Sequence, residues 1–185
     1  TYLKTIHNQM SAMFNHAIKF YGLQINPAAK AGSMGEKEAQ EMQFWTKEEY
    51  LKFAQVMMDK PRSYYAFELL YWTGIRSGEL LALTPSDFDF EKQTLRINKT
   101  FHRSNGEDII TTPKTVKSNR IITLPSFLCD EIKDYLGMFY EIGESERMFS
   151  FTKSYLGHEM ERGCKASGVK KIRIHDLRHS HACRS

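Results

Sequence analysis

Cysteine is scarce in this sequence of 185 residues, and long apolar runs are missing from it. The three cysteines are widely spaced and form no C-x-x-C pair, which argues against a disulfide framework and against a zinc site. No segment approaches the roughly 18 consecutive apolar residues of a membrane-spanning helix, and the opening residues, Thr1 and Tyr2, are neither an initiator methionine nor a secretory signal. We therefore expect a protein of a reducing cytoplasm without a membrane partner, whose chain starts within a longer protein or after processing.

Internal repeats, low-complexity tracts and a glycine-rich phosphate-binding loop are also missing. Apolar residues make up 41% of the chain and charged residues 26%, as in ordinary soluble globular proteins, which argues against a collagenous, disordered or coiled-coil class. The formal net charge of +4 permits a polyanionic partner without requiring one. The length suits one domain, or one domain and part of another.

The chain is predicted to contain one helix, a linker and a larger domain. Apolar side chains recur at helical spacing from the start of the chain to Tyr21, after which turn-forming residues follow. The next stretch is rich in Ala, Gly, Lys and Glu and poor in large apolar residues, a composition typical of a linker. We therefore predict a helix over 1–21 and divide the chain into a first segment over 1–26 that contains this helix, a linker over 27–43 and a second domain over 44–185.

The hydrophobic period of the second domain changes twice along the chain. Thr46, followed three residues later by Glu49, forms a capping box that starts a helix. The middle of the domain alternates, and Asn105-Gly106 is a strong hairpin signal. We expect helices over 46–58, 61–74, 77–83, 125–139, 156–166 and 172–181, and strands over 94–100, 108–112 and 120–124. The predicted fold class is α+β, a mostly helical domain with a small antiparallel three-stranded sheet.

Arg76 is the first candidate site residue. It follows a glycine-containing break between two predicted helices, so it lies near the N-terminus of the second one. Its guanidinium and the N–H groups of that helix can converge there on an anion. Glu79 lies three residues further on, on the same face, and could hold or orient Arg76. An ordinary surface ion pair between the two is the alternative.

Lys114 is the second candidate. It lies in the polar stretch Pro113–Asn119, which joins two predicted strands. A lysine on such a turn can reach a phosphate as a point charge or serve as a general acid. A solvated basic turn is the alternative interpretation.

The densest cluster of basic residues lies near the end of the sequence. His175 and Arg178 are three residues apart and share a helix face. An arginine there can neutralise an anionic centre while the imidazole donates or takes a proton near neutral pH. Metal binding through His175 and His179 competes, but Asp176 stands where an H-E-x-x-H motif requires glutamate. In a structural interpretation, Asp176 caps the helix and the histidines decorate it.

Together these residues describe a site for a phosphodiester that needs no metal. Several cations can share the charge on the phosphoryl oxygens, the role that Mg²⁺ plays in other enzymes. We therefore predict that Arg76, Lys114, His175 and Arg178 gather around one hollow, supported by Glu79, with no metal and no cofactor.

Three ordered motifs in the chain resemble those of the tyrosine recombinases, above all the integrases of phages and conjugative transposons. They are T-G-I-R-S-G-E-L-L-A-L from Thr73, P-K-T-x-x-S-x-R-x-I-x-L-P from Pro113 and I-H-D-L-R-H-S-H-A from Ile174. The likeness runs from about Phe44 to Ala182, and residues 1–26 resemble the last helix of the family's core-binding domain. Any one motif would be weak evidence, but their order and separations are highly specific.

The resemblance implies a role for each candidate residue. Arg76 and Arg178 match the two arginines that clamp the scissile phosphate, and Glu79 matches the acidic residue that supports the first. Lys114 matches the lysine that protonates the 5′-oxygen leaving group, and His175 matches a proton-transfer partner. A tyrosine of the family attacks the phosphate to give a 3′-phosphotyrosine and a 5′-hydroxyl. The partner implied is double-stranded DNA in the bacterial cytoplasm, on which the full-length proteins form tetramers.

The sequence departs from the family pattern near its end. The family places a Leu-Gly-His (or Trp) motif and then the nucleophilic tyrosine several tens of residues after the H-x-x-R pair, and none of the nine tyrosines here follows Arg178. The stretch Tyr155–His158 contains Leu-Gly-His but precedes His175, and we interpret it as a loop and helix start without a catalytic role. We therefore expect a monomeric, inactive fragment of an integrase catalytic domain that binds DNA without cleaving it. The alternatives are a non-catalytic DNA-binding or regulatory module of the same fold, and a metal-dependent hydrolase built on His175 and His179.

Overall fold

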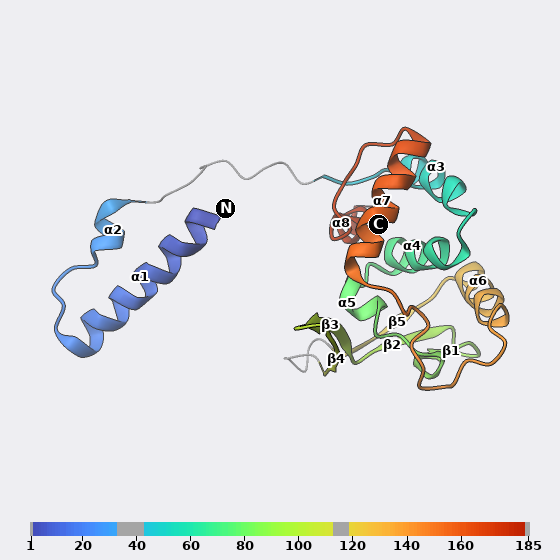
Figure 1. The fold of residues 1–185 in the computed structure, drawn as a ribbon, viewed down its shortest axis with the longest axis horizontal. Helices are drawn as coiled ribbons and strands as arrows, with labels where there is room; N and C mark the ends of the chain where they lie inside the picture. The colour runs from blue at the N-terminus through green and yellow to red at the C-terminus, as the bar shows by residue number, and fades with distance from the viewer. Residues whose placement is uncertain (1, 33–42, 113–118, 184–185) are drawn as a thin grey trace. The chain divides into compact units, whose positions relative to one another are not determined.

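The computed structural model describes residues 2–32, 43–112 and 119–183 (Figure 1). The chain divides into two compact units, Thr1–Glu41 and Met42–Ser185. Lys114 lies outside the described residues, so its predicted place in the site stays a prediction. Across the described ranges, no helix is both long and apolar enough to cross a membrane.

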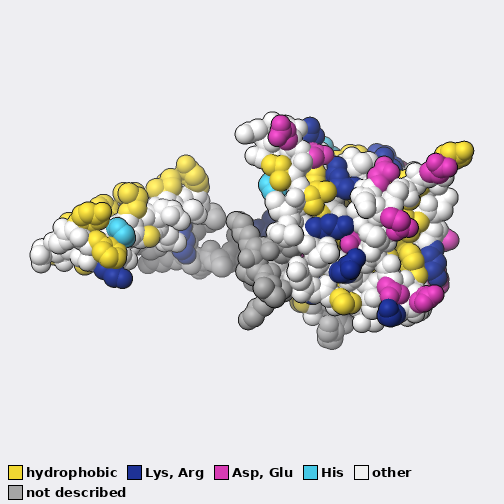
Figure 2. Space-filling model, turned by 90° about the horizontal axis from the view of Figure 1, so that it is seen from below, with side chains coloured by type: hydrophobic (Ala, Val, Ile, Leu, Met, Phe, Trp, Pro, Cys, Tyr) yellow, Lys and Arg dark blue, Asp and Glu magenta, His cyan; other side chains and the backbone are white. Residues whose placement is uncertain are grey.

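The first unit contains α1 (Tyr2–Tyr21) and the short α2 (Pro27–Ala31), which lies within the stretch predicted as a linker. Asn26 joins the two helices. Its Oδ1 accepts a hydrogen bond from the Ala29 N–H at 3.1 Å, which caps α2, and its Nδ2 donates to Asn15 Oδ1 of α1 at 2.7 Å. The helix predicted at the start of the chain is confirmed. None of the α1 side chains is buried, and much of its apolar stripe is exposed on this unit (Figure 2).

Helices of the second unit pack around an aromatic-rich core. They are α3 (Lys47–Met57), α4 (Pro61–Thr73), α6 (Ser126–Gly137), α7 (Lys153–Ser167) and α8 (Asp176–Ala182). α4 is buried over most of its length and packs against α3, α6 and α8. Tyr50 of α3 stacks on Tyr71 of α4 with ring centroids 3.6 Å apart. The predicted capping box of α3 is confirmed, since Thr46 N donates to Glu49 Oε2 at 2.8 Å and Glu49 N to Thr46 Oγ1 at 3.3 Å.

The strands within the described ranges form two small antiparallel sheets. β1 (Phe88–Asp89), β2 (Thr94–Ile97) and β5 (Arg120–Thr123) make one in the order β1-β2-β5, and β3 (Thr100–Ser104) pairs with β4 (Glu107–Thr111) in a separate hairpin. The α+β prediction with a small three-stranded sheet is confirmed. The third strand of that sheet is β1, whereas the strand predicted over 108–112 lies in β4 of the separate hairpin.

The strand predicted over 94–100 is divided because the backbone leaves the ladder at Asn98 and Lys99. Lys99 Nζ binds Asp87 Oδ2 at 2.8 Å and Thr84 Oγ1 at 2.7 Å, which ties this point to the segment before the sheet. β1 has only two residues, too few to show an alternating period.

Two short helical segments connect α4 to the sheet. These are α5 (Ser77–Leu80) and the 3₁₀ turn η1 (Pro85–Asp87). The helix predicted over 77–83 ends early, because the N–H groups of Ala82 and Leu83 bond three residues back, in tight turns. A Cβ atom on Gly78 would lie 2.6 Å from Thr100 Oγ1, so glycine lets α5 approach β3 closely.

α8 also begins later than predicted, at Asp176. The Asp176 carboxylate accepts from the Arg173 backbone N–H at 3.1 Å, and this bond holds the preceding residues in a turn. α7 begins earlier than predicted and contains Tyr155 in its first turn. The Tyr155 hydroxyl lies 3.0 Å from Ser63 Oγ of α4, a packing contact between the two helices.

Candidate functional site

Arg76 lies at the break between α4 and α5. α4 ends at Gly74 in the left-handed conformation, with φ 63°, and Arg76 is the extended N-cap residue of α5. The Arg76 N–H donates to Glu79 Oε2 at 2.8 Å, and its Nη1 donates to Glu79 Oε1 at 3.0 Å. The Glu79 side chain is 5% exposed and that of Arg76 53%, so the arginine reaches solvent from a buried carboxylate. The predicted pair is confirmed as a contact, and it is not an ordinary surface ion pair because one partner is buried.

Arg120 is a second arginine on the same carboxylate, and it is absent from the sequence-based site. It is the first residue of β5, where it pairs with Ile97, and it donates Nη1 to Glu79 Oε1 at 3.0 Å and Nη2 to Glu79 Oε2 at 2.7 Å. The alternation of side chains along β5 could have identified Arg120. Arg120 lies on the same face of the strand as Ile122, which packs on the core, and an inward-facing arginine requires a carboxylate partner.

Glu79 is held ionised by these contacts. Burial by itself would raise the pKa of its carboxyl group, but hydrogen bonds from the Arg120 side chain and the Arg76 N–H lower that pKa below its ordinary value. A buried carboxylate that accepts several charge-assisted hydrogen bonds is a rigid anchor for the guanidinium groups around it.

Arg178 reaches the same region from α8. Its Nη1 donates to the backbone oxygen of Gly74 at 2.7 Å, two residues before Arg76. Burial lowers the pKa of the Arg178 guanidinium, and the positive charges of Arg76 and Arg120 lower it further. The structure thus places Arg76 and Arg120 on Glu79 and anchors Arg178 on Gly74, two residues before Arg76 in the chain.

The histidines of α8 have different surroundings. His175 is the exposed N-cap residue of the helix, and its ring packs edge-to-face on that of His179 with centroids 5.4 Å apart. His181 was not predicted as a site residue, and its Nδ1 lies 3.1 Å from the Tyr71 carbonyl oxygen. Its ring also covers Gly74, since a Cβ atom added there would lie 2.8 Å from His181 Cδ2. The side chains of both His181 and Arg178 therefore contact the backbone at the end of α4.

Buried polar contacts fix α8 in this place. The Asp176 carboxylate accepts from Arg173 Nε at 2.9 Å and Nη2 at 2.8 Å, and the Arg173 side chain lowers the pKa of Asp176. Ser180 Oγ accepts from the Trp45 N–H at 2.9 Å and donates to the Asp176 carbonyl oxygen at 3.1 Å. Asp176 and Ser180 therefore have structural roles, and they set the direction in which Arg178 points.

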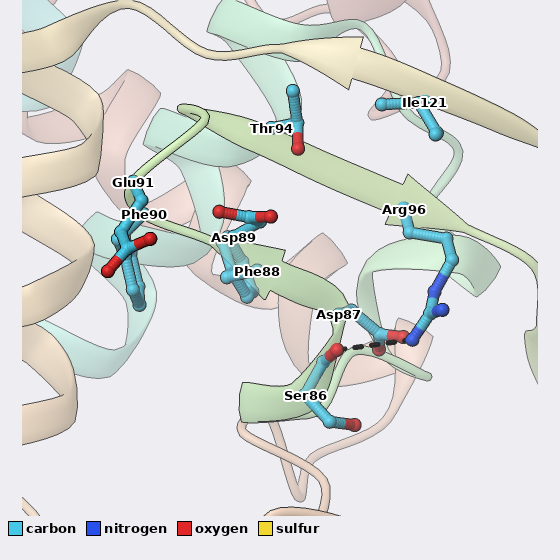
Figure 3. Close-up of a pocket in the computed structure, with 9 residues that line it drawn as sticks. All are labelled: Ser86, Asp87, Phe88, Asp89, Phe90, Glu91, Thr94, Arg96 and Ile121. Carbon is cyan, nitrogen blue, oxygen red and sulfur yellow. Dashed lines mark hydrogen bonds between the residues drawn. The ribbon is translucent and has the colours of Figure 1, made fainter.

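Two other candidate features contribute nothing to this cluster. Within the described part of the chain, no group of three or more His, Cys, Asp and Glu side chains is placed to hold a metal ion. A pocket of about 520 Å³ lies on the outer face of the three-stranded sheet and is lined by residues such as Phe88, Phe90, Thr94 and Arg96 (Figure 3). Arg96 donates there to the Ser86 carbonyl oxygen at 3.2 Å, and none of the predicted site residues lines the pocket.

Comparison with known proteins assigns the chain to a family. The model of the phage integrase family matches residues 43–184, which include the helices, sheets and arginine cluster of the second unit. The chain belongs to the phage integrase family. The resemblance of its three motifs to the tyrosine recombinases is therefore confirmed.

Curated members of the phage integrase family match almost the whole chain. The ICEBs1 integrase of Bacillus subtilis is 28% identical over 97% of this chain and 52% of its own length. A XerC-like tyrosine recombinase of Caldanaerobacter subterraneus is 27% identical over 97% of this chain and 54% of its own length. The integrase of Mycobacterium phage L5 is 27% identical over 93% and 48%. The chain thus spans about half the length of these relatives.

Solved structures of integrases share the fold. The Tn1549 transposon integrase, solved in complex with a circular intermediate DNA, has a TM-score of 0.80 at 21% identity and covers 98% of this chain and 66% of its own. A lambda integrase dimer bound to a core site has a TM-score of 0.66 at 21% identity, over 97% of this chain and 64% of its own.

Proposed function

We propose that the second unit is the catalytic domain of a DNA integrase, which cuts and rejoins DNA strands through a 3′-phosphotyrosine intermediate. The observation that carries the proposal is the convergence of Arg76 and Arg178 beside the Glu79 carboxylate, in a chain of the phage integrase family. Family relatives named as integrases and solved relatives in complex with DNA support double-stranded DNA as the partner.

The arginines would bind the scissile phosphate. Arg76 presents a half-exposed guanidinium, and Arg178 approaches from α8 while anchored on the Gly74 carbonyl oxygen. Two guanidinium groups offer donor pairs that match phosphoryl oxygens and stabilise the charge that develops in the transition state. Glu79 would hold Arg76 in place, because it binds both the backbone and the side chain of that residue.

Proton transfer would fall to Lys114 and His175. In the proposed step a tyrosine oxygen bonds to phosphorus, the bond from phosphorus to the 5′-oxygen breaks, and Lys114 protonates that oxygen to leave a 5′-hydroxyl. His175, exposed at the start of α8 and three residues from Arg178, would exchange a proton with the attacking tyrosine or the phosphoryl group. The energy of the broken bond stays in the phosphotyrosine, so the reverse attack can reseal the strand.

The nucleophile is proposed to come from outside these 185 residues. The last tyrosine of the sequence is Tyr155, which precedes His175 and binds Ser63 within the helical core. We therefore expect the 185-residue polypeptide by itself to bind duplex DNA as a monomer without cleaving it. Residues 1–26 would be the last helix of a core-binding domain and 27–43 the linker, and a protein of the relatives' full length would form tetramers on DNA in the bacterial cytoplasm.

A suicide DNA substrate tests this account. On such a substrate any cleavage is trapped as a covalent protein–DNA adduct. We expect the 185-residue chain to give a retarded complex whose affinity falls with salt, with a log–log slope of about −0.9 per neutralised phosphate, and no adduct stable to detergent. An adduct would show that a nucleophile lies within the chain. In a protein of full length, Arg76→Ala should abolish cleavage and keep much of the duplex affinity; loss of binding alone would make Arg76 a positioning contact only.

A non-catalytic DNA-binding module of the same fold is the second candidate. Strand transfer by a protein of full length would exclude a non-catalytic function. A full-length protein that binds DNA without strand transfer would support it.

A further inference from the structure

Glu79 accepts hydrogen bonds from two arginines at once. Arg120 supplies two of them, at 3.0 and 2.7 Å, and Arg76 supplies two more, at 2.8 Å from its backbone and 3.0 Å from its side chain. A carboxylate has about four acceptor positions. The four contacts therefore use the full capacity of this group, and any donor that leaves frees a position for another.

The two guanidinium groups share Glu79 unequally. Arg120 binds it as a fork with both terminal nitrogens, and its side chain is 26% exposed. Arg76 binds it with Nη1, and its side chain is 53% exposed. Bidentate pairs between arginine and carboxylate are the stronger kind. Arg120 is thus the main counter-charge of Glu79, and within the described part of the chain Arg76 is held to the carboxylate by one of its three side-chain nitrogens.

This division matters for an anion at the site. If Arg120 were absent, Arg76 alone would neutralise the buried Glu79 carboxylate. The vacated acceptor positions of Glu79 would then draw the Arg76 guanidinium into a bidentate pair. The Arg76 fork would then face Glu79 instead of solvent. The positive charge near Arg178 would also fall by one, because Arg120 contributes to the field at that residue.

We infer that Arg120 is a positioning residue, which neutralises Glu79 so that the Arg76 guanidinium stays available to a phosphate. The inference rests on the proposed function, since it assumes that Arg76 and Arg178 bind phosphate. Arg120 itself is not required to contact the DNA. Its effect is transmitted through Glu79, which gives a distinctive signature: removing the carboxylate's charge should cancel the effect of removing Arg120.

The test measures inorganic phosphate binding to the 185-residue chain by NMR, through the side-chain Nε–H signals of Arg76 and Arg178. Arg120→Gln should weaken phosphate binding about tenfold, the size expected when one charge-assisted hydrogen bond is lost. The double variant Glu79→Gln/Arg120→Gln should recover affinity to within about threefold of the wild type, because it removes the uncompensated charge while an amide oxygen at position 79 can still accept from the Arg76 N–H. Arg96→Gln is the matched control, because Arg96 lies on the neighbouring strand and faces the opposite side of the sheet. It should bind phosphate like the wild type.

The outcomes separate the inference from the proposed function. If Arg76→Ala weakens phosphate binding and Arg120→Gln does not, the role of Arg120 is wrong and the proposed site stands. If Arg120→Gln and the double variant are equally weak, Arg120 acts on the fold or on phosphate directly and not through Glu79, and the inference is again wrong. If Arg76→Ala binds phosphate as the wild type does, the proposed site falls, and the role of Arg120 with it.

Thermal unfolding of each variant checks that it is folded. Should Arg120→Gln not fold, Arg120→Lys carries the test, since lysine keeps the charge but cannot form the bidentate fork. We expect an intermediate loss of phosphate affinity in that variant, and an unchanged affinity would contradict the inference.

Discussion

Gly74 ends α4 and contacts α8 through Arg178 and His181. Replacing it by alanine should destabilise the second unit by about 2–4 kcal/mol. Gly74 has φ 63°, and a residue with a Cβ atom pays roughly 1–2 kcal/mol for this left-handed conformation, offset by about 0.5 kcal/mol from the stiffer unfolded chain. The new Cβ atom would also lie 2.8 Å from His181 Cδ2 and 3.1 Å from its Cγ. Overpacking of this kind adds about 1–3 kcal/mol.

Gly168 provides a matched control. It ends α7 in the same left-handed conformation, with φ 71°, but a Cβ atom there would meet no heavy atom of the described residues within 4 Å. Gly168→Ala should therefore cost only about 1 kcal/mol. Urea unfolding followed by tryptophan fluorescence measures both losses, because Trp45 and Trp72 lie in the second unit.

The difference between the two variants isolates the contact with His181. Adding His181→Ala to Gly74→Ala should recover part of the extra loss, because it removes the clash. Equal losses in Gly74→Ala and Gly168→Ala would refute the argument that α8 presses on the end of α4 through His181.

Three further predictions concern the helical core. Burial raises the pKa of Glu68 to about 7, so the stability that its neutral form contributes is full below about pH 4.5 and is lost as the pH rises through 7. Glu68→Gln should therefore stabilise the protein at pH 8 by about 1–3 kcal/mol and leave its stability at pH 4.5 unchanged. Urea unfolding at both pH values measures this difference. Gly163→Ala should cost about 2–4 kcal/mol, since its Cβ atom would clash with the Phe53 ring and lie 2.7 Å from Met57 Sδ, and an unchanged midpoint of urea unfolding would contradict close packing of α3 on α7. Ser180→Ala should cost about 1–3 kcal/mol, because the buried Trp45 N–H loses its acceptor, and Ser180→Thr should cost less if the hydroxyl keeps its place.

Local signals predicted much of the second unit correctly. The Thr46 and Glu49 capping box, the proline that starts α4 and the Asn105-Gly106 turn each act within a few residues, and each lies where the sequence placed it. The predictions failed where a distant contact decides the outcome. Lys99 leaves the strand because Asp87 and Thr84 bind its side chain, and no period of the sequence records that attraction.

The candidate site shows the same division. Arg76 and Glu79 could be paired from their spacing, since residues three apart on a helix are neighbours. Arg178 was selected for its chemistry beside His175, but its anchor on the Gly74 carbonyl oxygen comes from the packing of α8 on α4. Arg120 and His181 were missed for this reason, because their partners lie 41 and 110 residues away in the chain.

The amino-acid order alone determined where most of the helices lie, the family motifs and the residue types suited to a phosphodiester, since these depend on neighbours in the chain and on side-chain chemistry. Only the tertiary structure decided that two arginines share one buried carboxylate while a third approaches from another helix. The physical reason is that a buried charge must find its counter-charge in space, and the sheet register and helix packing that bring β5, α5 and α8 together set which residue supplies it.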